Sequence, residues 1–418
     1  MSAPAVPLHP ALAEPTERTS KLWVAWVVLA SIGLWSGFFG PIQVLLAEQA
    51  ATISPDHKAA VLSLVTGIGA AVSMVSNPVW GAFSDRTTLR VGRRLPWVVG
   101  GAAGGAVAML VLSVAHSILL MVVGCALAQA ALNAMLAAIT AAIPDQVPTR
   151  ERATVGGVVS IAQTAGVVVG SGIAAATGSI AVGYLTIAAV LLLTTVPYSL
   201  RSRDIALPVE LRPPFDWGQF WRGFWISPRR HPDYGWAWFT RFLMNLGNAF
   251  LILYLLYYLT DAVGLSTDEA ATGVFRLTAV YGAVTVVTAI VGGRWSDRVG
   301  RRKVFVIWSG LITAAALLLF ALVPTTAAAY AAAVILGIGF GAYQAVDFAM
   351  ITQVLPAARD RGKDLGVINI ANAMPQVLAP VFAAGVLAVG LGYRGLYILA
   401  AVVSVLGSVL VVRIRSLA

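Results

Sequence analysis

Charged residues are scarce in this sequence. Asp, Glu, Lys and Arg together make up 11% of the 418 residues, whereas hydrophobic residues make up 59% and the mean hydropathy is +0.84. A soluble domain carries about a quarter of charged residues, so a chain covered by water is excluded. The apolar residues form runs of about twenty, the length at which a helix crosses a bilayer. The composition therefore predicts an all-α membrane protein.

Side chains that bind metals or carry out catalysis are also few. The single cysteine, Cys125, lies in an apolar run, which excludes an intramolecular disulfide and a cysteine-based metal cluster. The four histidines lie in tails and loops and are too scattered for a metal site. The chain also lacks a Gly-x-x-x-x-Gly-Lys-Ser/Thr phosphate loop. We therefore expect no enzyme activity, no metal, no cofactor and no use of ATP.

The apolar runs predict about twelve membrane-spanning helices. Their expected ranges are 22–47, 58–82, 95–115, 118–143, 153–177, 180–199, 235–260, 268–293, 303–323, 326–355, 364–388 and 391–412. The longest connection, residues 200–234, holds six Arg and five Pro. We expect tails at 1–21 and 413–418, and a linker at 200–234 that joins two six-helix bundles, 22–199 and 235–412.

The positive charge follows the topology of these spans. The net charge is +10, and all but four of the 28 Lys and Arg fall in the tails or in connections on one side of the membrane. Lys58 and Arg394 lie on the other side, and Arg241 and Arg276 lie within spans. By the positive-inside rule, both termini are cytoplasmic in a multi-pass cell (inner) membrane protein. The charge therefore does not indicate nucleic acid as a partner.

The linker contains one amphipathic stretch. Trp217, Phe220, Trp221, Phe224 and Trp225 follow helical spacing, which gathers five large rings on one face. Trp and Phe partition to the headgroup boundary, so this pattern predicts a short helix at the cytoplasmic membrane surface. The alternative is packing against the ends of the transmembrane bundle. Both readings are structural.

A charged turn occurs twice, at matching places in the two halves. The first copy reads Gly81-Ala82-Phe83-Ser84-Asp85-Arg86 and continues Gly92-Arg93-Arg94; the second reads Gly293-Arg294-Trp295-Ser296-Asp297-Arg298 and continues Gly300-Arg301-Arg302. Such duplication indicates two similar halves, the design of transporters that work by alternating access. We expect Asp85 and Asp297, with neighbouring arginines and helix ends, to hold the cytoplasmic ends together in the outward-facing state.

With twelve spans and a central loop, these turns resemble the major facilitator superfamily, whose turn is Gly-x-x-x-Asp-Arg-x-Gly-Arg-Arg. The first copy carries four additional residues, Thr88-Leu89-Arg90-Val91, and continues Leu95-Pro96-Trp97. This longer form is similar to the glycoside–pentoside–hexuronide cation symporters and the sucrose-type proton symporters, as is Pro144-Asp145-Gln146-Val147-Pro148. The resemblance implies a twelve-helix fold whose helices 1, 4, 7 and 10 line a central cavity. We expect a monomer.

One departure from that branch concerns sodium. Melibiose-type symporters carry two aspartates on helix 2, at positions that correspond here to Ser73 and Asn77, just before Pro78. Neutral hydroxyl and amide groups do not supply the carboxylate charge that a sodium ion prefers. The sodium site is therefore expected to be absent, which leaves proton-coupled or uncoupled transport.

Ionisable groups inside spans are costly and usually face a cavity or a partner. Asp347 lies about nine residues before Pro356, roughly 13 Å from the cytoplasmic end of its helix, with Tyr343 and Gln344 on the same side. A desolvated carboxyl of this kind can gain and lose a proton near neutral pH. Asp347 is our candidate for the coupling residue; the alternative is a permanently ionised Asp that holds an arginine between helices.

The two arginines within spans are candidate partners or solute contacts. Arg241, Asn245 and Asn248 form a stripe on helix 7, from which Arg241 can face Asp347. Arg276 lies in the outer half of helix 8 and is a candidate contact for an anionic solute, or a partner of Glu48 or Asp347. For both arginines the alternative is a purely structural ion pair.

Amide side chains recur on the expected cavity helices. Amides both donate and accept hydrogen bonds, which suits hydroxyl-rich ligands, although single amides also tie membrane helices together. The remaining cavity candidates are Gln43, Gln129, Asn133, Asn369, Asn372 and Gln376.

Three functions remain open at this point. The first is proton-coupled uptake of a sugar or another small polar solute, favoured by the longer first turn and the amides. The second is proton-driven export of an amphipathic compound or lipid, because the spans are rich in Ala, Gly, Val and Leu. The third is a sensor that moves no solute, which the two intact turns disfavour.

Overall fold

The computed structural model describes residues 15–201, 204–212, 214, 216–218, 220, 229, 231–299, 301–354 and 361–415. All regular structure in these residues is helical, and twelve helices are long and apolar enough to cross a membrane. The long helices are α1 (Lys21–Gly40) with its continuation α2 (Leu46–Ile53), α3 (Lys58–Asp85), α4 (Leu95–Ser113), α5 (Ile118–Gln146), α6 (Thr149–Ala176), α7 (Ile180–Arg201), α9 (Pro232–Tyr257), α10 (Thr267–Val299), α11 (Arg302–Leu322), α12 (Thr326–Val354), α13 (Arg361–Ala388) and α14 (Gly392–Val409). The expected all-α fold with twelve spans is confirmed.

Several helices extend beyond the apolar runs that predicted them. α10 reaches Val299 rather than residue 293, and α6 begins at Thr149 rather than residue 153. Turns of charged residues can continue a helix once it has left the hydrocarbon core, because water satisfies their side chains. A pattern based on apolar residues therefore stops too early. The core of each span was predicted correctly.

The first span contains an irregular turn. Residues Pro41–Leu45 form a π-helical turn, η1, in which the Leu46 N–H donates to the carbonyl oxygen of Pro41. Proline has no N–H and its ring clashes with the preceding turn, so the regular α-helical ladder cannot continue unchanged through it. A second π-helical turn, η4 (Tyr258–Ala262), ends the seventh span. The two irregular turns occur in the first span of each half.

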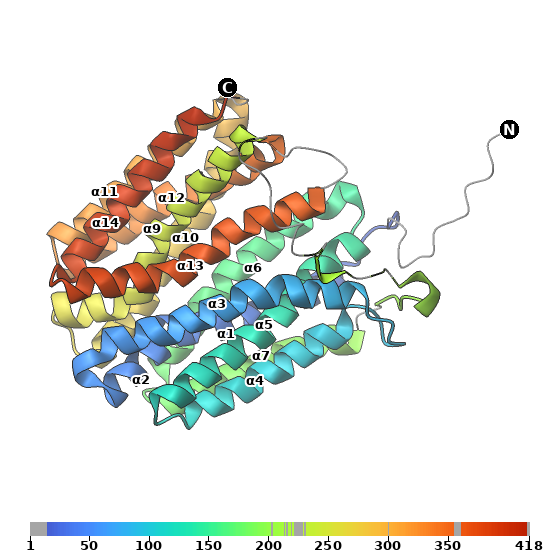
Figure 1. The fold of residues 1–418 in the computed structure, drawn as a ribbon, viewed down its shortest axis with the longest axis horizontal. Helices are drawn as coiled ribbons and strands as arrows, with labels where there is room; N and C mark the ends of the chain where they lie inside the picture. The colour runs from blue at the N-terminus through green and yellow to red at the C-terminus, as the bar shows by residue number, and fades with distance from the viewer. Residues whose placement is uncertain are drawn as a thin grey trace.

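The two halves repeat one packing scheme. In the first half, α3 and α4 pack on α5, α6 and α7 pack on α1, and α7 packs on α4; in the second, α10 and α11 pack on α12, α13 and α14 pack on α9, and α14 packs on α11. The halves meet where α3 packs on α13 and α6 packs on α10. Figure 1 shows the first half in blue to green beside the second in yellow to red. This is the expected pair of pseudo-symmetric six-helix bundles.

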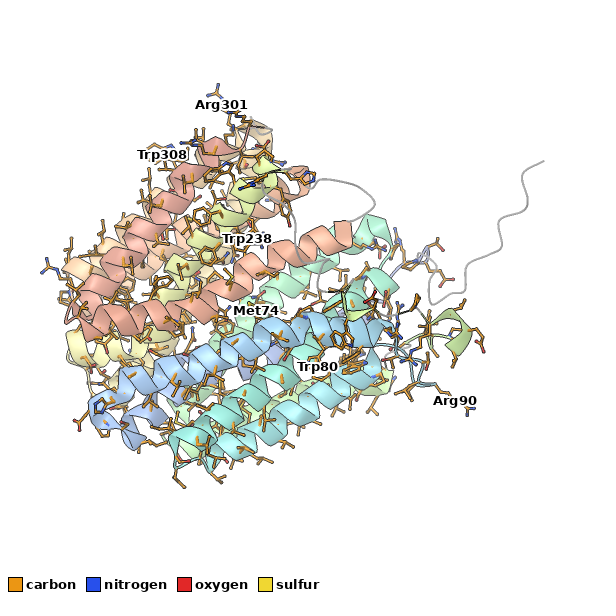
Figure 2. The ribbon with its side chains drawn as sticks, in the orientation of Figure 1. Met74, Trp80, Arg90, Trp238, Arg301 and Trp308 are labelled. Carbon is orange, nitrogen blue, oxygen red and sulfur yellow. The ribbon has the colours of Figure 1, made fainter. Side chains whose placement is uncertain are left out.

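The first charged turn lies at the end of α3 and the second at the end of α10, the matching helices of the two halves. Both turns therefore lie at the same end of the molecule, which we call the motif end. Figure 2 shows Arg90, in the first turn, and Arg301, in the second, on well-separated parts of this end. The other end of the bundle, where Lys58 of α3 pairs with Asp261 of η4, is called the opposite end. The cavity described below is defined relative to these two ends.

The described part of the linker packs against the bundle. The ring of Trp217 meets Phe83, near the end of α3, edge-to-face with centroids 6.2 Å apart, and Phe83 stacks on Trp97. For Trp217 the structure thus shows packing against the bundle end. Phe220 meets the Trp217 ring edge-to-face with centroids 6.0 Å apart, whereas Trp221, Phe224 and Trp225 lie outside the described residues.

Candidate functional site: a central cavity and the contacts at its two ends

A cavity of about 1740 Å³ lies between the two halves. It is lined from both sides, by α1 with η1, α3, α5 and α6 of the first half and by α9, α10, α12 and α13 of the second. It extends to the first charged turn, because Asp85, Arg86 and Arg93 are part of its wall. The predicted residues that line it are Gln43, Gln129, Asn133, Arg241, Asn245, Asn248, Tyr343, Gln344, Asp347, Asn372 and Gln376.

One predicted cavity residue, Arg276, does not join this set. Arg276 is exposed and does not line the cavity, and it makes no ion pair with Glu48 or Asp347 among the described residues. Its neighbours Leu277, Thr278 and Tyr281 face the cavity instead, and a step of one residue turns a side chain by about 100°. The prediction for Arg276 was wrong because a single residue carries no information on which face of its helix is inside. The side chain of Asn369 lies outside the described part.

The second half contributes a buried ion pair to the wall. Arg241 Nη1 of α9 lies 2.6 Å from Asp347 Oδ2 of α12, and the two side chains are only 16% and 6% exposed. The expected meeting of these two residues is thus confirmed. The other oxygen, Asp347 Oδ1, accepts a hydrogen bond of 3.0 Å from the Tyr343 hydroxyl one turn earlier. Both oxygens of the carboxylate are therefore satisfied by protein groups.

Amides extend this network along the wall. Asn372 of α13 accepts two hydrogen bonds at Oδ1, from Arg241 Nε at 2.7 Å and from Asn245 Nδ2 at 3.1 Å. Asn245 Nδ2 also donates to the Arg241 carbonyl oxygen at 2.9 Å. Three helices, α9, α12 and α13, are thereby joined around one positive and one negative charge. A change in the charge of Asp347 would alter the contacts that join these three helices.

The first half contributes uncharged polar groups. Asn133 of α5 donates to Ser73 Oγ at 2.8 Å and to the Gln129 carbonyl oxygen at 2.8 Å, and accepts from Asn77 Nδ2 at 3.2 Å. Ser73 and Asn77 thus face the amides of α5. Asn133 Nδ2 thus makes two hydrogen bonds and its Oδ1 one, whereas the side-chain amide of Gln129 bonds to no described residue and borders the cavity.

The first charged turn is held by a cluster of ion pairs. Arg94 reaches Asp85 Oδ1 at 2.6 Å and Asp145 Oδ2 at 2.8 Å, and donates to Ser84 Oγ at 2.9 Å; Arg93 reaches the same oxygen of Asp145 at 2.7 Å. Burial lowers the pKa of the Arg94 guanidinium, but Asp85 and Asp145 outweigh it and raise that pKa above its usual value. The cluster joins the ends of α3, α4 and α5 within one half.

A carboxylate from beyond α7 caps the next helix. Asp204 Oδ2 accepts hydrogen bonds from the backbone N–H groups of Arg94 and Leu95, at the start of α4. Burial raises the pKa of Asp204, although these two donors oppose the rise. Gly92 makes the approach possible: its φ is +115°, and a Cβ there would meet the Asp204 carboxylate. Neither Asp145 nor Asp204 was predicted as part of this site.

The second charged turn is described only in part. Arg298 and Arg301 are exposed at the motif end, and Ser296 is buried like its counterpart Ser84. Gly300 and the side chain of Asp297 lie outside the described residues. The predicted role of Asp297 in holding the ends together stays a prediction.

The opposite end is closed by contacts between the halves. Ser63 of α3 is hydrogen-bonded to the Tyr254 hydroxyl of α9, and the Tyr257 hydroxyl donates to the Ala47 carbonyl oxygen of α2 at 2.8 Å. Lys58 Nζ lies 2.6 Å from Asp261 Oδ1 in η4, and this contact closes the opposite end further. The cavity is therefore open toward the motif end and sealed at the other.

A comparison with protein families identifies the chain at this point. The family profile described as Major Facilitator Superfamily matches residues 26–275 and 237–417. The chain belongs to the major facilitator superfamily. It is accordingly an integral, multi-pass membrane protein that moves a small solute by alternating access as a secondary transporter, and not an enzyme.

Solved structures give the same fold. A bacterial homologue of the human lysosomal transporter Spinster, in an inward-facing and unoccupied conformation, superposes on this transporter with a TM-score of 0.69 at 17% identity, covering 94% of this chain and 95% of that chain. A structure described as the inward-facing and occupied conformation of such a homologue gives a TM-score of 0.68 at 16% identity, with the same coverage. No curated protein sequence matches the chain.

Proposed function

We propose that this transporter couples the movement of a small polar, sugar-like solute to protons, with Asp347 as the proton-carrying residue. The observation that carries the proposal is the buried Arg241–Asp347 ion pair on the wall of the cavity. Coupling needs a group whose proton affinity differs between the two conformations. A carboxylate beside an arginine meets this condition when the distance between them changes with the conformation.

The position of the pair supports this role. Asp347 and Arg241 lie on helices α12 and α9 of the same half, and Asn372 of α13 ties them to the helix that packs on α3 of the other half. When the halves rock, α13 moves against α3, and the hydrogen bond to Asn372 is one route by which this movement reaches Arg241. Protonation of Asp347 would free the arginine for a new partner.

The orientation of the transporter in the membrane is inferred from the distribution of charge. The motif end carries the basic turns, so we infer that it faces the cytoplasm, with both termini on that side. The conformation with the cavity open at the motif end is then inward-facing. Release to, or uptake from, the cytoplasm would take place in this state.

The nature of the solute rests on the polar wall. Amides and hydroxyls from both halves alternate with the rings of Trp35, Phe38 and Phe39, and amide groups can match the donors and acceptors of a polyhydroxylated solute. The same aromatic wall would also suit an amphipathic compound, so proton-driven export of such a compound or of a lipid is the second candidate. A sensor that moves no solute is the third.

The test is transport in proteoliposomes that contain a pH-sensitive dye. Sugars, amino acids and short amphipathic cations are added one at a time, with and without a pH gradient. Solute-dependent proton entry, and accumulation driven by the gradient, are expected for a small polar solute. Asp347→Asn should abolish accumulation while solute exchange persists, whereas Glu48→Gln, at a carboxylate in the first span that does not line the cavity, serves as the matched control. Accumulation at the wild-type level in Asp347→Asn would refute the assignment.

A further inference from the structure

Two glutamines of the first span, Gln43 and Gln49, differ in one respect. Both are buried, at 3% and 4% exposure. Gln49 Nε2 donates to the carbonyl oxygens of Leu112 and Ala115, and its Oε1 accepts from the Tyr184 hydroxyl. Gln43 borders the cavity, and its Oε1 is buried without a hydrogen-bond partner among the described residues. Gln49 is therefore a structural amide, whereas Gln43 has an acceptor that the protein leaves unused.

The backbone holds Gln43 firmly in this position. It lies in the middle of the π-helical turn η1, which begins at Pro41. Isolated π-helical turns are rare and are often found at functional sites. The preceding Gly40 packs so closely on α6 that a Cβ there would lie 2.9 Å from the carbonyl oxygen of Gly170. An unsatisfied buried acceptor costs about 1–3 kcal/mol, so this fixed oxygen beside the cavity is a candidate to meet a solute.

The cavity wall near Gln43 carries no charged side chain among the described residues. Among the described residues, the charged side chains in the cavity wall all lie nearer the motif end: Asp85, Arg86, Arg93, Asp216, Arg241 and Asp347. Arg241 and Asp347 moreover neutralise each other. A charged solute group at the closed end near Gln43 would be desolvated without a counter-charge, which is strongly unfavourable. The group that meets Gln43 must therefore be an uncharged donor.

The first half offers unused hydrogen-bonding capacity to the cavity. There, Gln129 offers a whole side-chain amide to the cavity. α5 and α12 both have 29 residues, and the positions in α12 that match Gln129 and Asn133 are Gly337 and Gly341. A Cβ at Gly341 would lie 2.5 Å from the Thr285 carbonyl oxygen, so α10 and α12 leave no room for a side chain there. The pair Gln129 and Asn133 thus has no counterpart at the matching positions of α12.

We propose that Gln43 is a specificity-determining residue that accepts a hydrogen bond from a hydroxyl of an uncharged, polyhydroxylated solute at the closed end of the cavity. Gln129 contacts the same solute, whose far side points toward the Arg241–Asp347 pair. The assignment rests on the proposed transport of a small polar solute. It adds that the solute is uncharged and polyhydroxylated, and states how the solute is oriented in the cavity.

Thermal melting of the purified, full-length transporter in detergent provides the first part of the test. Gln43→Leu removes an acceptor with no partner, so the melting temperature should stay unchanged or rise. The matched control, Gln49→Leu, removes three hydrogen bonds and should melt several degrees lower. If Gln43→Leu melts as low as Gln49→Leu, the acceptor is already used inside the protein and the proposal fails.

Binding provides the second part, with sucrose, melibiose, xylose and sorbitol as probes, followed by the monodeoxy analogues of any that bind. Gln43→Leu should bind about three- to tenfold more weakly, the equivalent of one lost hydrogen bond. One deoxy analogue should lack the hydroxyl that Gln43 binds. For that analogue, the loss of binding free energy from removing the hydroxyl and the loss from Gln43→Leu should not add. Equal affinity of wild type and Gln43→Leu, or binding of none of these probes, would overturn the inference.

The two proposals fail in different ways. If a probe binds through Gln43 but no proton entry accompanies its transport, the coupling is wrong and the role of Gln43 stands. If amino acids drive proton entry while no sugar or polyol binds, the coupling stands and the role of Gln43 falls.

Discussion

Replacing Asp347 by Asn tests the ion pair at the centre of the site. The carboxamide keeps an oxygen that can accept from the Tyr343 hydroxyl, but it presents either a neutral oxygen or an N–H donor to Arg241. Arg241 retains its hydrogen bond to Asn372. The change therefore leaves a largely buried guanidinium without a counter-charge and alters little of the shape.

The size of the effect follows from burial. Removing one partner of a buried ion pair costs about 3–5 kcal/mol. Because Arg241 is 16% exposed and borders the cavity, we expect the lower value, about 3 kcal/mol, which is more than a hundredfold in the unfolding equilibrium. Arg241→Gln alone should cost a similar amount. The double variant Asp347→Asn/Arg241→Gln removes both charges and should recover most of the loss, to within about 1 kcal/mol of wild type.

Melting followed by intrinsic fluorescence measures these differences. For a unit the size of one half, 1 kcal/mol shifts the melting temperature by about 2–4 °C, so each single variant should melt roughly 6–12 °C lower. The double variant should melt higher than either single variant. Single variants that melt within about 2 °C of wild type, or losses that simply add in the double variant, would refute the buried pair as a source of stability.

Three further substitutions and one ion test the rest of the molecule. Asp85→Asn should raise the population open at the motif end. In that state Arg94 loses Asp85 but keeps Asp145, whereas the contact expected in the other state is lost without a substitute; unchanged cysteine labelling of the cavity would contradict this. Asp261→Asn should favour opening of the opposite end about two- to fivefold, the effect of a partly exposed pair, measured by labelling from that side. Gly92→Ala should cost about 1–3 kcal/mol, since its φ is +115°, whereas Gly100→Ala, with open space around it, should not lower the melting temperature. Sodium should not stimulate transport over choline at fixed pH, and a clear stimulation would require a cation site elsewhere.

Much of the architecture could be predicted because its signals are local. A run of apolar residues reports a span by itself, and a rare charge inside a span must find a partner, so Asp347 and Arg241 could be matched before their helices were placed. The same reasoning failed for Arg276. In its case the helix could be predicted, but the face that looks inward is decided by neighbouring helices.

The contacts that close the two ends could not be predicted. The Tyr254 hydroxyl and Ser63 are common residue types separated by 191 positions, and no spacing rule connects them. The cap that Asp204 places on α4 likewise spans more than a hundred positions. Gln43 and Gln49 are identical in type, yet only tertiary contacts decide that one is structural and the other faces the cavity.

The packing scheme has a consequence for how the chain can be assembled. Within each half, every helix packs on helices of the same half. Most of the contact between the halves is made by two helix pairs, α3 with α13 and α6 with α10. Asp204 is bonded to α4 of its own half, so the start of the linker belongs with the first bundle. A gene divided in the later part of that linker should therefore yield two fragments that insert separately and reassemble in the membrane. Recovery of activity from co-expressed fragments, with none from either alone, would show that covalent continuity between the halves is dispensable.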